Sequence, residues 1–504
     1  MSLPLKSFIV FQGNLIAKFL GLIGMSLVAH LMGPGPIGML AFAYAFIGLF
    51  EFIFDPGLST AHIKLAAEKK DFDYCVGTYL FLKIVSTIIA SVVILGAVFW
   101  TIRFRGGFES PDLKVVVYII LFSKVIENIF MYPLVSFNAT QEMAKRTAIQ
   151  IVKSIAELIF VSSVALFFRN VLALALTHVL TEIVIAGTSL YLFKDYQIKC
   201  PRLLDLKRYI KFSLPLIGAA VIGILSRNID KVMIQAFWGS IEVGQYHCAG
   251  RATMVILIFS SSLMTVLIPT FSLLHTRGGP GELNELLAKS EKYLILLTGP
   301  ALVVLFVFAR PLVILILGNK FEMSILITRI LCVSTLCITV IRPLNSLIIG
   351  TGRVKWIFYW TFFAVGVNLI FNSILIPEQF LGIKMLGLGA PGAAIATVIS
   401  VVLAVIATII YLMKTEKIKL FVNLGKYLFP VFIIVPLFIF GIFPITGEDI
   451  WVLSLSPLAI IFYLGLLALS GEFGKPEIQL LIMTINPQRL KEYISGEFQD
   501  EKKS

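Results

Sequence analysis

The sequence predicts an all-α protein that crosses a membrane about fourteen times. Of its 504 residues, 58% are hydrophobic and only 14% are charged, whereas a soluble domain carries about 25% charged residues. The chain contains roughly fourteen apolar runs of about 18–28 residues, each long enough to span a hydrocarbon core about 30 Å thick. Each run must be helical, because lipid offers no hydrogen-bond partner for backbone N–H and C=O groups.

The first predicted helix is a spanning helix rather than a removed signal, because no small-residue cleavage site follows a short apolar core.

The connection from 194 to 211 carries six basic residues and Pro201, which stops a helix. It separates six runs from eight and predicts a six-helix bundle over 1–206, a second over 207–413, and two further helices with a tail over 414–504. The predicted helices lie near 8–31, 36–60, 76–100, 115–137, 147–168, 171–193, 212–237, 243–274, 291–317, 323–349, 354–376, 389–413, 427–444 and 451–470.

Two stretches of the first half recur in the second. The segment Gly33–Gly38 separates the first two runs of its half, and Gly239–Gly244 does the same 206 positions later. Likewise, Ala139–Gln141 precedes the fifth run of its half, as Gly350–Gly352 does 211 positions later. Halves with six helices each would share their orientation and be related by an axis along the membrane normal. Transporters built from repeats place their site between the halves.

The net charge of +13 is explained by topology rather than by nucleic-acid binding. Most Lys and Arg residues of the loops fall on the side that also holds both termini, which predicts cytoplasmic termini. We expect no cofactor, no metal and no catalytic residue. No phosphate-binding G-x-x-x-x-G-K-[ST] loop occurs, and the five cysteines lack zinc-site spacing. The glycines of Gly33–Gly38 match a dinucleotide fingerprint, but two prolines there remove the N–H donors that it needs.

Charged residues inside the runs need partners or water. There are ten basic and six acidic ones, and at roughly 2.5 kcal/mol each they would together cost on the order of 40 kcal/mol if unpaired. Some lie three or four positions from a potential partner on the same helix face. The pairs predicted in this way are Lys124 with Glu127, Lys153 with Glu157, Arg227 with Asp230, and His178 with Glu182.

The remaining charges have no partner of opposite sign on their own helix. Surplus cations together with the carboxylates Glu51 and Asp55 favour a cavity for an anionic cargo and a coupling ion. The alternative is structural: Glu51 or Asp55 would form salt bridges with Lys18 or Lys83 on neighbouring helices. The sequence Asp55-Pro56-Gly57 also predicts a break in the second helix.

Four stretches of the chain resemble a known family. They are Leu31–Pro34 with Gly38, Asp55–Leu58, Ser226–Lys231 with Gly239–Ala249, and Val367–Pro377 with Gly389–Thr397. Together they resemble the polysaccharide-biosynthesis membrane transporters, the lipid-linked oligosaccharide flippases of the multidrug/oligosaccharidyl-lipid/polysaccharide exporter superfamily. The resemblance implies two six-helix bundles in a V, alternating access, and a cargo of polyprenyl-phosphate- or diphosphate-linked glycan whose phosphate meets cations in the central cavity.

The hypothesis that follows is a flippase in the cytoplasmic membrane and not an enzyme. Its partners would be the lipid-linked glycan, membrane lipids, and glycosyltransferases or a polymerase, with no nucleic acid. A proton or sodium ion would bind carboxylates and bias the two access states. The candidate substrate-binding residues are Lys18, Arg227, Lys231, Arg251 and Arg342. The candidate ion-coupling residues are Glu51, Asp55 and Asp230.

Three alternatives remain open. A multidrug and toxin antiporter of the same superfamily would favour carboxylates in its cavity, because its cargoes are cationic. A scaffold that does not transport would recruit glycosyltransferases through its cytoplasmic loops. A membrane glycosyltransferase would need a loop large enough for a nucleotide-sugar domain, and the sequence has none between its runs.

Overall fold

The computed structural model describes residues 3–415, apart from 69–70, 105 and 278–279, together with 433, 450–471 and 473–474. Within these residues, nine helices are long and apolar enough to cross a membrane, and two bent helix pairs would raise the number to eleven. The all-α, multi-pass fold is therefore confirmed, while the number fourteen stays a prediction. The predicted helix near 427–444 lies outside the described residues.

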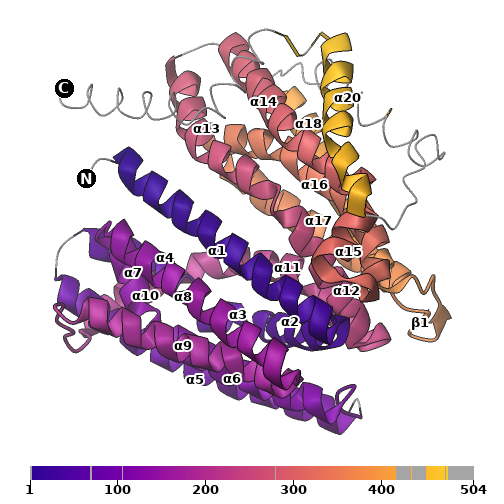
Figure 1. The fold of residues 1–504 in the computed structure, drawn as a ribbon. Coiled ribbons are helices and arrows are strands. Elements are labelled where there is room, and N and C mark those ends of the chain that lie inside the picture. Colours follow the sequence, from indigo (N-terminus) through magenta and orange to yellow (C-terminus); the bar gives the residue numbers. More distant parts are fainter. Residues whose placement is uncertain are drawn as a thin grey trace.

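The first half of the chain forms a helical bundle, drawn in indigo and magenta in Figure 1. In it α1 packs against α8, and α9 packs against both α6 and α8. Its elements are α1 (Leu3–Met32), α2 (Pro34–Gly48), α3 (Glu51–Phe54), α4 (Leu58–Ala67), α5 (Phe72–Phe104), α6 (Pro111–Phe130), α7 (Tyr132–Ala139), α8 (Met143–Ser163), the π-helical turn η1 (Val164–Phe168) and α9 (Val171–Phe193).

The second half forms another bundle, in which α16 packs against α13, α14 and α18. A short antiparallel hairpin pairs Gln379 with Lys384 and Phe380 with Ile383. Although it follows the first half in sequence, α10 (Leu203–Ser213) packs against α4 and α5 of the first bundle. The elements after it are η2 (Leu214–Leu216), α11 (Ile217–Trp238), α12 (Ser240–Met254), α13 (Leu257–Arg277), α14 (Pro280–Val307), α15 (Ala309–Leu317), η3 (Asn319–Phe321), α16 (Glu322–Gly350), α17 (Val354–Leu375), β1 (Gln379–Phe380), β2 (Ile383–Lys384), α18 (Gly389–Thr415), η4 (Ile450–Leu455) and α20 (Ser456–Leu469).

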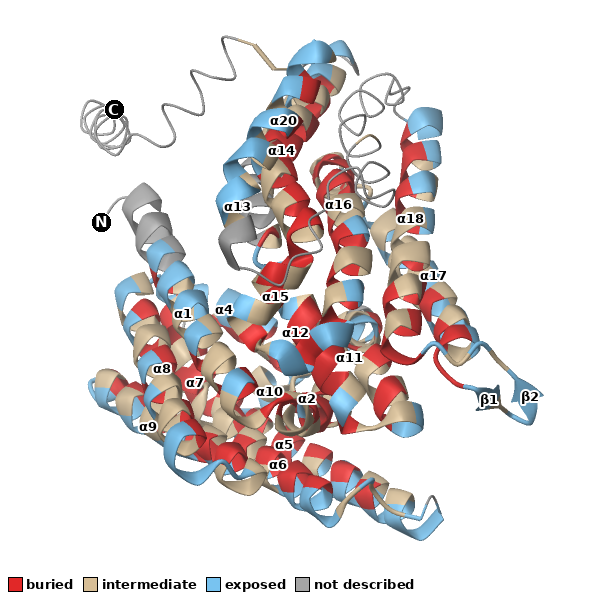
Figure 2. Cartoon of the chain, turned by 45° about the vertical axis from the view of Figure 1, so that its right-hand side comes forward, coloured by how far each residue is buried: buried red, intermediate tan, exposed pale blue. Residues whose placement is uncertain are grey.

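The two bundles form a V, as predicted from the resemblance. In Figure 1 they diverge on the side where α1 begins and meet on the side where α1 ends and α2 begins. Buried residues line the helix faces that turn toward other helices (Figure 2). Large apolar side chains such as Phe99, Phe167 and Phe362 are exposed on the outside, as expected for helices that face lipid rather than water.

The repeated glycines form equivalent turns. Gly33 has φ 82° and ψ −170°, and Gly239 has φ 87° and ψ −176°. Essentially only glycine adopts this region of backbone space. Each glycine ends the first long helix of its half and begins the second, so the first sequence repeat corresponds to a repeated structure.

The second repeat also has matching backbone geometry. Thr140 has φ −82° and ψ −1°, and Thr351 has φ −83° and ψ 4°. The residues that follow, Gln141 and Gly352, have φ 59° and 76°. The same left-handed turn therefore joins α7 to α8 and α16 to α17, which supports the interpretation of two related halves.

The closed end of the V is built from the first repeat. A Cβ on Gly38 would lie 1.7 Å from the carbonyl oxygen of Ser240, and a Cβ on Gly244 would lie 2.1 Å from that of Pro34. Ser240 and Gly244 occupy the positions of Pro34 and Gly38 shifted by 206. The contact is thus reciprocal, as it is at a two-fold interface. At these glycines the backbones of α2 and α12 are in direct contact.

A carboxylate from the first half also joins the two bundles at this end. Glu109, just before α6, accepts hydrogen bonds through Oε2 from Gln235 Nε2 at 2.6 Å and from the N–H and Oγ of Ser240 at 2.8 and 2.6 Å. Ser240 is the first residue of α12, where a negative charge is stabilised by the helix dipole. Glu109 therefore fastens the loop of one bundle to the start of a helix in the other.

The predicted break at Asp55-Pro56-Gly57 is confirmed. The segment Pro34–Gly48 and the segment Glu51–Ala67 are bent by 51° relative to each other, and Gly57 has φ 93°. The break ends α3 before Asp55, so the carboxylate of Asp55 accepts a hydrogen bond from the N–H of Ser59 at 3.1 Å.

Candidate functional site between the two halves

A cavity of about 180 Å³ lies between the bundles, a short distance from the α2–α12 contact along the same helices. The first half contributes residues of α1, α2, α8 and α9 to its lining, and the second half contributes residues of α11 and α12. Its charged and polar lining residues are Tyr44, Glu157, His178, Asn228, Lys231, His247 and Arg251. The cavity lies where repeat-built transporters hold their cargo.

The wall from the second half is basic. Asn228 and Lys231 are three positions apart on α11, and His247 and Arg251 are four apart on α12, so each pair shares one helix face. Lys231 donates to the carbonyl of Arg227 at 3.4 Å. Neither Lys231 nor Arg251 has a carboxylate within ion-pair distance in the described part of the chain. The wall therefore presents two positive charges to the cavity.

The wall from the first half differs in chemistry. Tyr44 comes from α2, Glu157 from α8 and His178 from α9. The rings of Tyr44 and His178 meet edge to face, with centroids 5.3 Å apart and an interplanar angle of 79°. Among the described residues, the Glu157 carboxylate has no hydrogen-bond or ion-pair partner. The cavity is thus polarised, with a carboxylate on one side and two cations on the other.

The structure brings together two of the five predicted substrate-binding residues. Lys231 and Arg251 line the cavity. Lys18 and Arg227 are exposed and are not part of its lining, although α1 also carries lining residues. Arg342 donates from Nη1 to the carbonyl oxygen of Leu257 at 3.2 Å, away from the cavity.

The pairings predicted within single helices are correct only in part. Lys124 does bind Glu127, at 2.9 Å. The predicted pair of Lys153 with Glu157 is wrong, because Lys153 binds Glu182 on the adjacent α9 at 2.8 Å. Glu182 therefore binds Lys153 and not its predicted partner His178. The physical reason is that a carboxylate on a packed neighbouring helix lies closer to Lys153 than one a turn away on its own helix.

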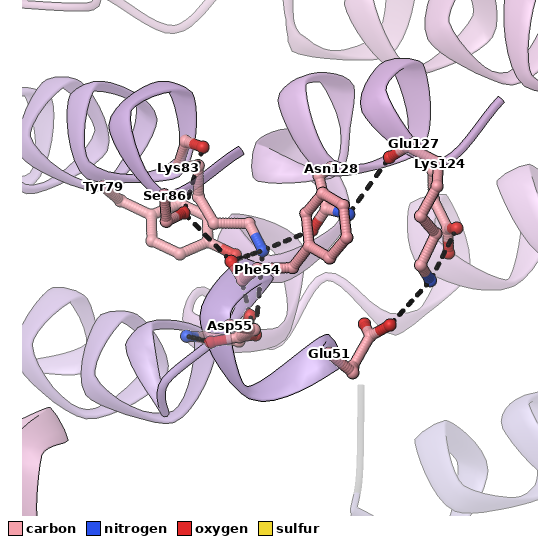
Figure 3. A network of polar contacts seen from close by, with 10 residues as sticks. Glu51, Phe54, Asp55, Tyr79, Lys83, Ser86, Lys124, Glu127 and Asn128 are labelled. Carbon is pink, nitrogen blue, oxygen red and sulfur yellow. Dashed lines mark hydrogen bonds and ion pairs between the residues drawn. The ribbon is translucent and has the colours of Figure 1, made fainter. Parts of the chain in front are cut away.

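The predicted ion-coupling residues Glu51 and Asp55 belong to a network inside the first bundle (Figure 3). Asp55 lies 3.8 Å from the ammonium of Lys83, and Glu51 lies 3.3 Å from that of Lys124. Lys83 is completely buried and also donates to Asn128 Oδ1 at 2.7 Å. The structural alternative of a cross-helix salt bridge is therefore confirmed for Asp55 and Lys83.

The predicted pair of Arg227 with Asp230 is wrong. The carboxylate of Asp230 is buried and accepts hydrogen bonds from Tyr246 at 2.6 Å, from Asn372 Nδ2 at 2.7 Å and from Thr397 at 3.3 Å. The Oδ1 atom of Asn372 is buried with no hydrogen-bond partner. Spacing on one helix cannot reveal this cluster, because its members come from α11, α12, α17 and α18.

Five charged or polar lining residues were missed by sequence analysis: Tyr44, Glu157, His178, Asn228 and His247. A signal was present for His247, which lies four positions before Arg251 and therefore on the same face of α12. Glu157 and His178 were assigned to partners on their own helices. Tyr44 carries no charge, so a search for charges inside the membrane could not find it.

The sequence matches a known protein family and two curated proteins. The family described as "Polysaccharide biosynthesis protein" matches residues 27–326, more than half of the chain. A protein of Haloferax volcanii described as "Probable low-salt glycan biosynthesis flippase Agl15" is 22% identical over 421 residues, covering 83% of this chain and 85% of that protein. An uncharacterized membrane protein of Methanocaldococcus jannaschii is 23% identical over 444 residues, covering 83% and 99%.

Solved structures confirm the fold. The lipid II flippase MurJ in an inward closed conformation is similar with a TM-score of 0.71 at 14% identity, covering 91% of this chain and 98% of that one. A multidrug resistance MATE family transporter in an inward-facing conformation is similar with a TM-score of 0.54 at 16% identity, covering 81% and 96%. At these identities the likeness extends to the fold alone.

Proposed function

This chain belongs to the polysaccharide biosynthesis protein family, and on that premise we propose that it is a flippase. It would carry a polyprenyl-phosphate- or diphosphate-linked oligosaccharide or polysaccharide unit across the cytoplasmic membrane by alternating access. The observation that carries the proposal is the cavity between the halves, in which Lys231 and Arg251 have no carboxylate partner among the described residues. The relative described as a glycan biosynthesis flippase supports it.

Two cations that line a cavity between membrane-spanning helices attract an anion. A charge left without a partner there is costly, and a phosphate offers several acceptor oxygens that bind ammonium and guanidinium groups strongly. The cavity of about 180 Å³ is smaller than the roughly 300–1,000 Å³ of pockets that enclose a whole ligand. It would therefore hold the phosphate and its nearest neighbour, while the lipid tail stays in the bilayer.

The state of the V fits loading from the cytoplasm. The excess of basic loop residues on the side of both termini predicts that the termini are cytoplasmic, and α1 begins on the open side of the V (Figure 1). With this orientation the V opens inward, and the contact of Gly38 and Gly244 closes the outer side. Transport then requires this contact to separate.

We assign ion coupling to the cluster around Asp230. Its carboxylate, the Thr397 hydroxyl and the unpartnered Asn372 oxygen are hard oxygen ligands that suit a proton or a sodium ion. The cluster joins α11, α12, α17 and α18, so ion binding there would affect how these helices pack. An ion shifts the two access states only by its differential affinity for them.

The alternative of a multidrug cation antiporter has the MATE-like fold in its favour. The charges of the cavity favour an anionic cargo instead, because two unpartnered cations face a single carboxylate. In this proposal glycosyltransferases or a polymerase would supply or use the cargo, and the protein itself would perform no chemical reaction.

Changing Lys231 and Arg251 to glutamine is expected to weaken phosphate binding. Each charge-assisted hydrogen bond contributes about 1.5–3 kcal/mol, so each single variant should raise the dissociation constant roughly 10- to 100-fold. The measurement is a titration of purified full-length protein in detergent with decaprenyl phosphate. The matched control is Lys289→Gln, an exposed lysine paired with Glu285. Binding unchanged in both cavity variants would refute the proposed site.

Replacing Asp230 by asparagine is expected to uncouple transport from its ion. The variant keeps the shape of the side chain and loses the charge, so decaprenyl phosphate should bind as in the wild type. In liposomes, the stimulation of glycolipid translocation by a pH or sodium gradient should disappear. If the gradient still stimulates the variant as it does the wild type, Asp230 is not the coupling group.

A further inference from the structure

The wall of the cavity opposite the two cations has its own unused binding groups. Tyr44, Glu157 and His178 come from three different helices and converge on the same cavity. In the described residues, neither the Tyr44 hydroxyl, nor the Glu157 carboxylate, nor a ring nitrogen of His178 has a hydrogen-bond partner. Tyr44 is 38% exposed, and Glu157 and His178 are partly exposed, so a ligand in the cavity can reach all three groups.

The three groups together select a particular chemistry. A carboxylate accepts two hydrogen bonds, and an imidazole both donates and accepts one. The ring of Tyr44 adds a flat apolar face, held edge-on against His178 at 5.3 Å. A second phosphate is disfavoured beside Glu157 by charge repulsion, and a lipid tail would leave all three groups unpaired. A sugar ring satisfies the whole set, because it combines several hydroxyl groups with an apolar C–H face.

We propose that Tyr44, Glu157 and His178 form a subsite for the first sugar of the cargo, next to the phosphate. The inference rests on the proposed function, because Lys231 and Arg251 must hold the phosphate on the opposite wall. Both walls belong to one cavity of about 180 Å³, so two groups joined by a single bond can occupy them together. The first half then recognises the sugar and the second half recognises the phosphate.

The consequence is selection between loaded and bare carrier lipid. A bare polyprenyl phosphate binds the cations but has no hydroxyl groups for the polar groups of the opposite wall. A site that hydrogen-bonds the hydroxyl groups of a ligand favours that ligand over an analogue that lacks them. The subsite would therefore favour glycosylated lipid, and a glycan that bridges both walls would draw the two halves together.

The experiment compares two probes on purified full-length protein: decaprenyl phosphate and decaprenyl phosphate that carries a single hexose. The wild type is expected to bind the glycosylated probe at least about tenfold more tightly. Glu157→Gln and Tyr44→Ala should bring that ratio close to one, because each removes a contact that only the hexose makes. Tyr44→Phe, which keeps the ring, should retain part of the preference.

Controls separate this inference from the proposed function. Glu285→Gln and Tyr191→Ala change exposed residues that do not line the cavity and should keep the wild-type ratio. Lys231→Gln should weaken both probes equally and also keep the ratio. A wild-type ratio of one, or a ratio that survives both Glu157→Gln and Tyr44→Ala, overturns the sugar subsite. Unchanged binding of both probes by Lys231→Gln overturns the phosphate site instead.

Discussion

Replacing Gly38 by alanine is expected to slow transport by roughly 5- to 150-fold in a protein that still folds. The new Cβ would lie 1.7 Å from the carbonyl oxygen of Ser240 and 2.8 Å from the backbone nitrogen of Gly244. Neither backbone atom can rotate away, so α2 and α12 must move apart. Overpacking of this kind costs about 1–3 kcal/mol. The cost applies only while the V is closed at this end, so it shifts the population away from that state.

The reciprocal geometry predicts the same result for Gly244→Ala, whose Cβ would meet Pro34. Translocation of a fluorescent polyprenyl glycolipid in liposomes measures the loss, and distances between spin labels on the two bundles measure the opening. Gly187→Ala and Gly223→Ala are matched controls, because an added Cβ there meets nothing within 4 Å. Transport by Gly38→Ala at the rate of these controls would show that the contact is not a working gate.

The repeat illustrates how far the sequence reaches into the fold. The offset of 206 predicts that Gly33 and Gly239 occupy equivalent turns, and their backbone angles agree within a few degrees. The sequence cannot predict that Gly38 contacts Ser240, because an internal repeat relates two halves without fixing which of their surfaces meet. A small residue at a helix surface fits many close packings, and only the three-dimensional arrangement selects one.

The site was predictable to the extent that its members are charged and lack a partner on their own helix. That rule found Lys231 and Arg251, which line the cavity. The rule missed Glu157, because spacing on the helix pairs Glu157 with Lys153. In the structure Lys153 binds Glu182 across the α8–α9 contact instead. In a membrane bundle, the packing of neighbouring helices determines which charged residues form pairs. Residue spacing along one helix does not contain this information.

Removing the charge of Asp55 alone is expected to destabilise the protein more than removing both charges of its ion pair. The side chain of Lys83 is 0% exposed and lies 3.8 Å from the carboxylate of Asp55. Asp55→Asn leaves this ammonium inside the bundle with neutral hydrogen-bond acceptors, the oxygens of Phe54 and Asn128. Breaking one side of a buried pair typically costs about 3–5 kcal/mol, whereas replacing both partners is often close to neutral.

Thermal unfolding of the purified protein, followed by fluorescence, measures the difference. Asp55→Asn should lower the midpoint by several degrees, since about 1 kcal/mol corresponds to roughly 2–4 °C even in a domain of 150–250 residues. The double variant Asp55→Asn with Lys83→Met should recover most of the loss. The exposed pair of Glu285 and Lys289 provides the control, and changing either partner there should leave the midpoint where it is.

The double variant also decides between the two roles open to Asp55. It lacks the carboxylate but is expected to fold, so its transport reports on function without the loss of stability. Ion-driven translocation at the wild-type rate would make Asp55 a structural partner of Lys83 and leave Asp230 as the coupling carboxylate. A stable double variant that translocates without responding to an ion gradient would make Asp55 a coupling group. An Asp55→Asn protein that melts like the wild type would contradict the buried-pair argument itself, because Lys83 would then need no anion.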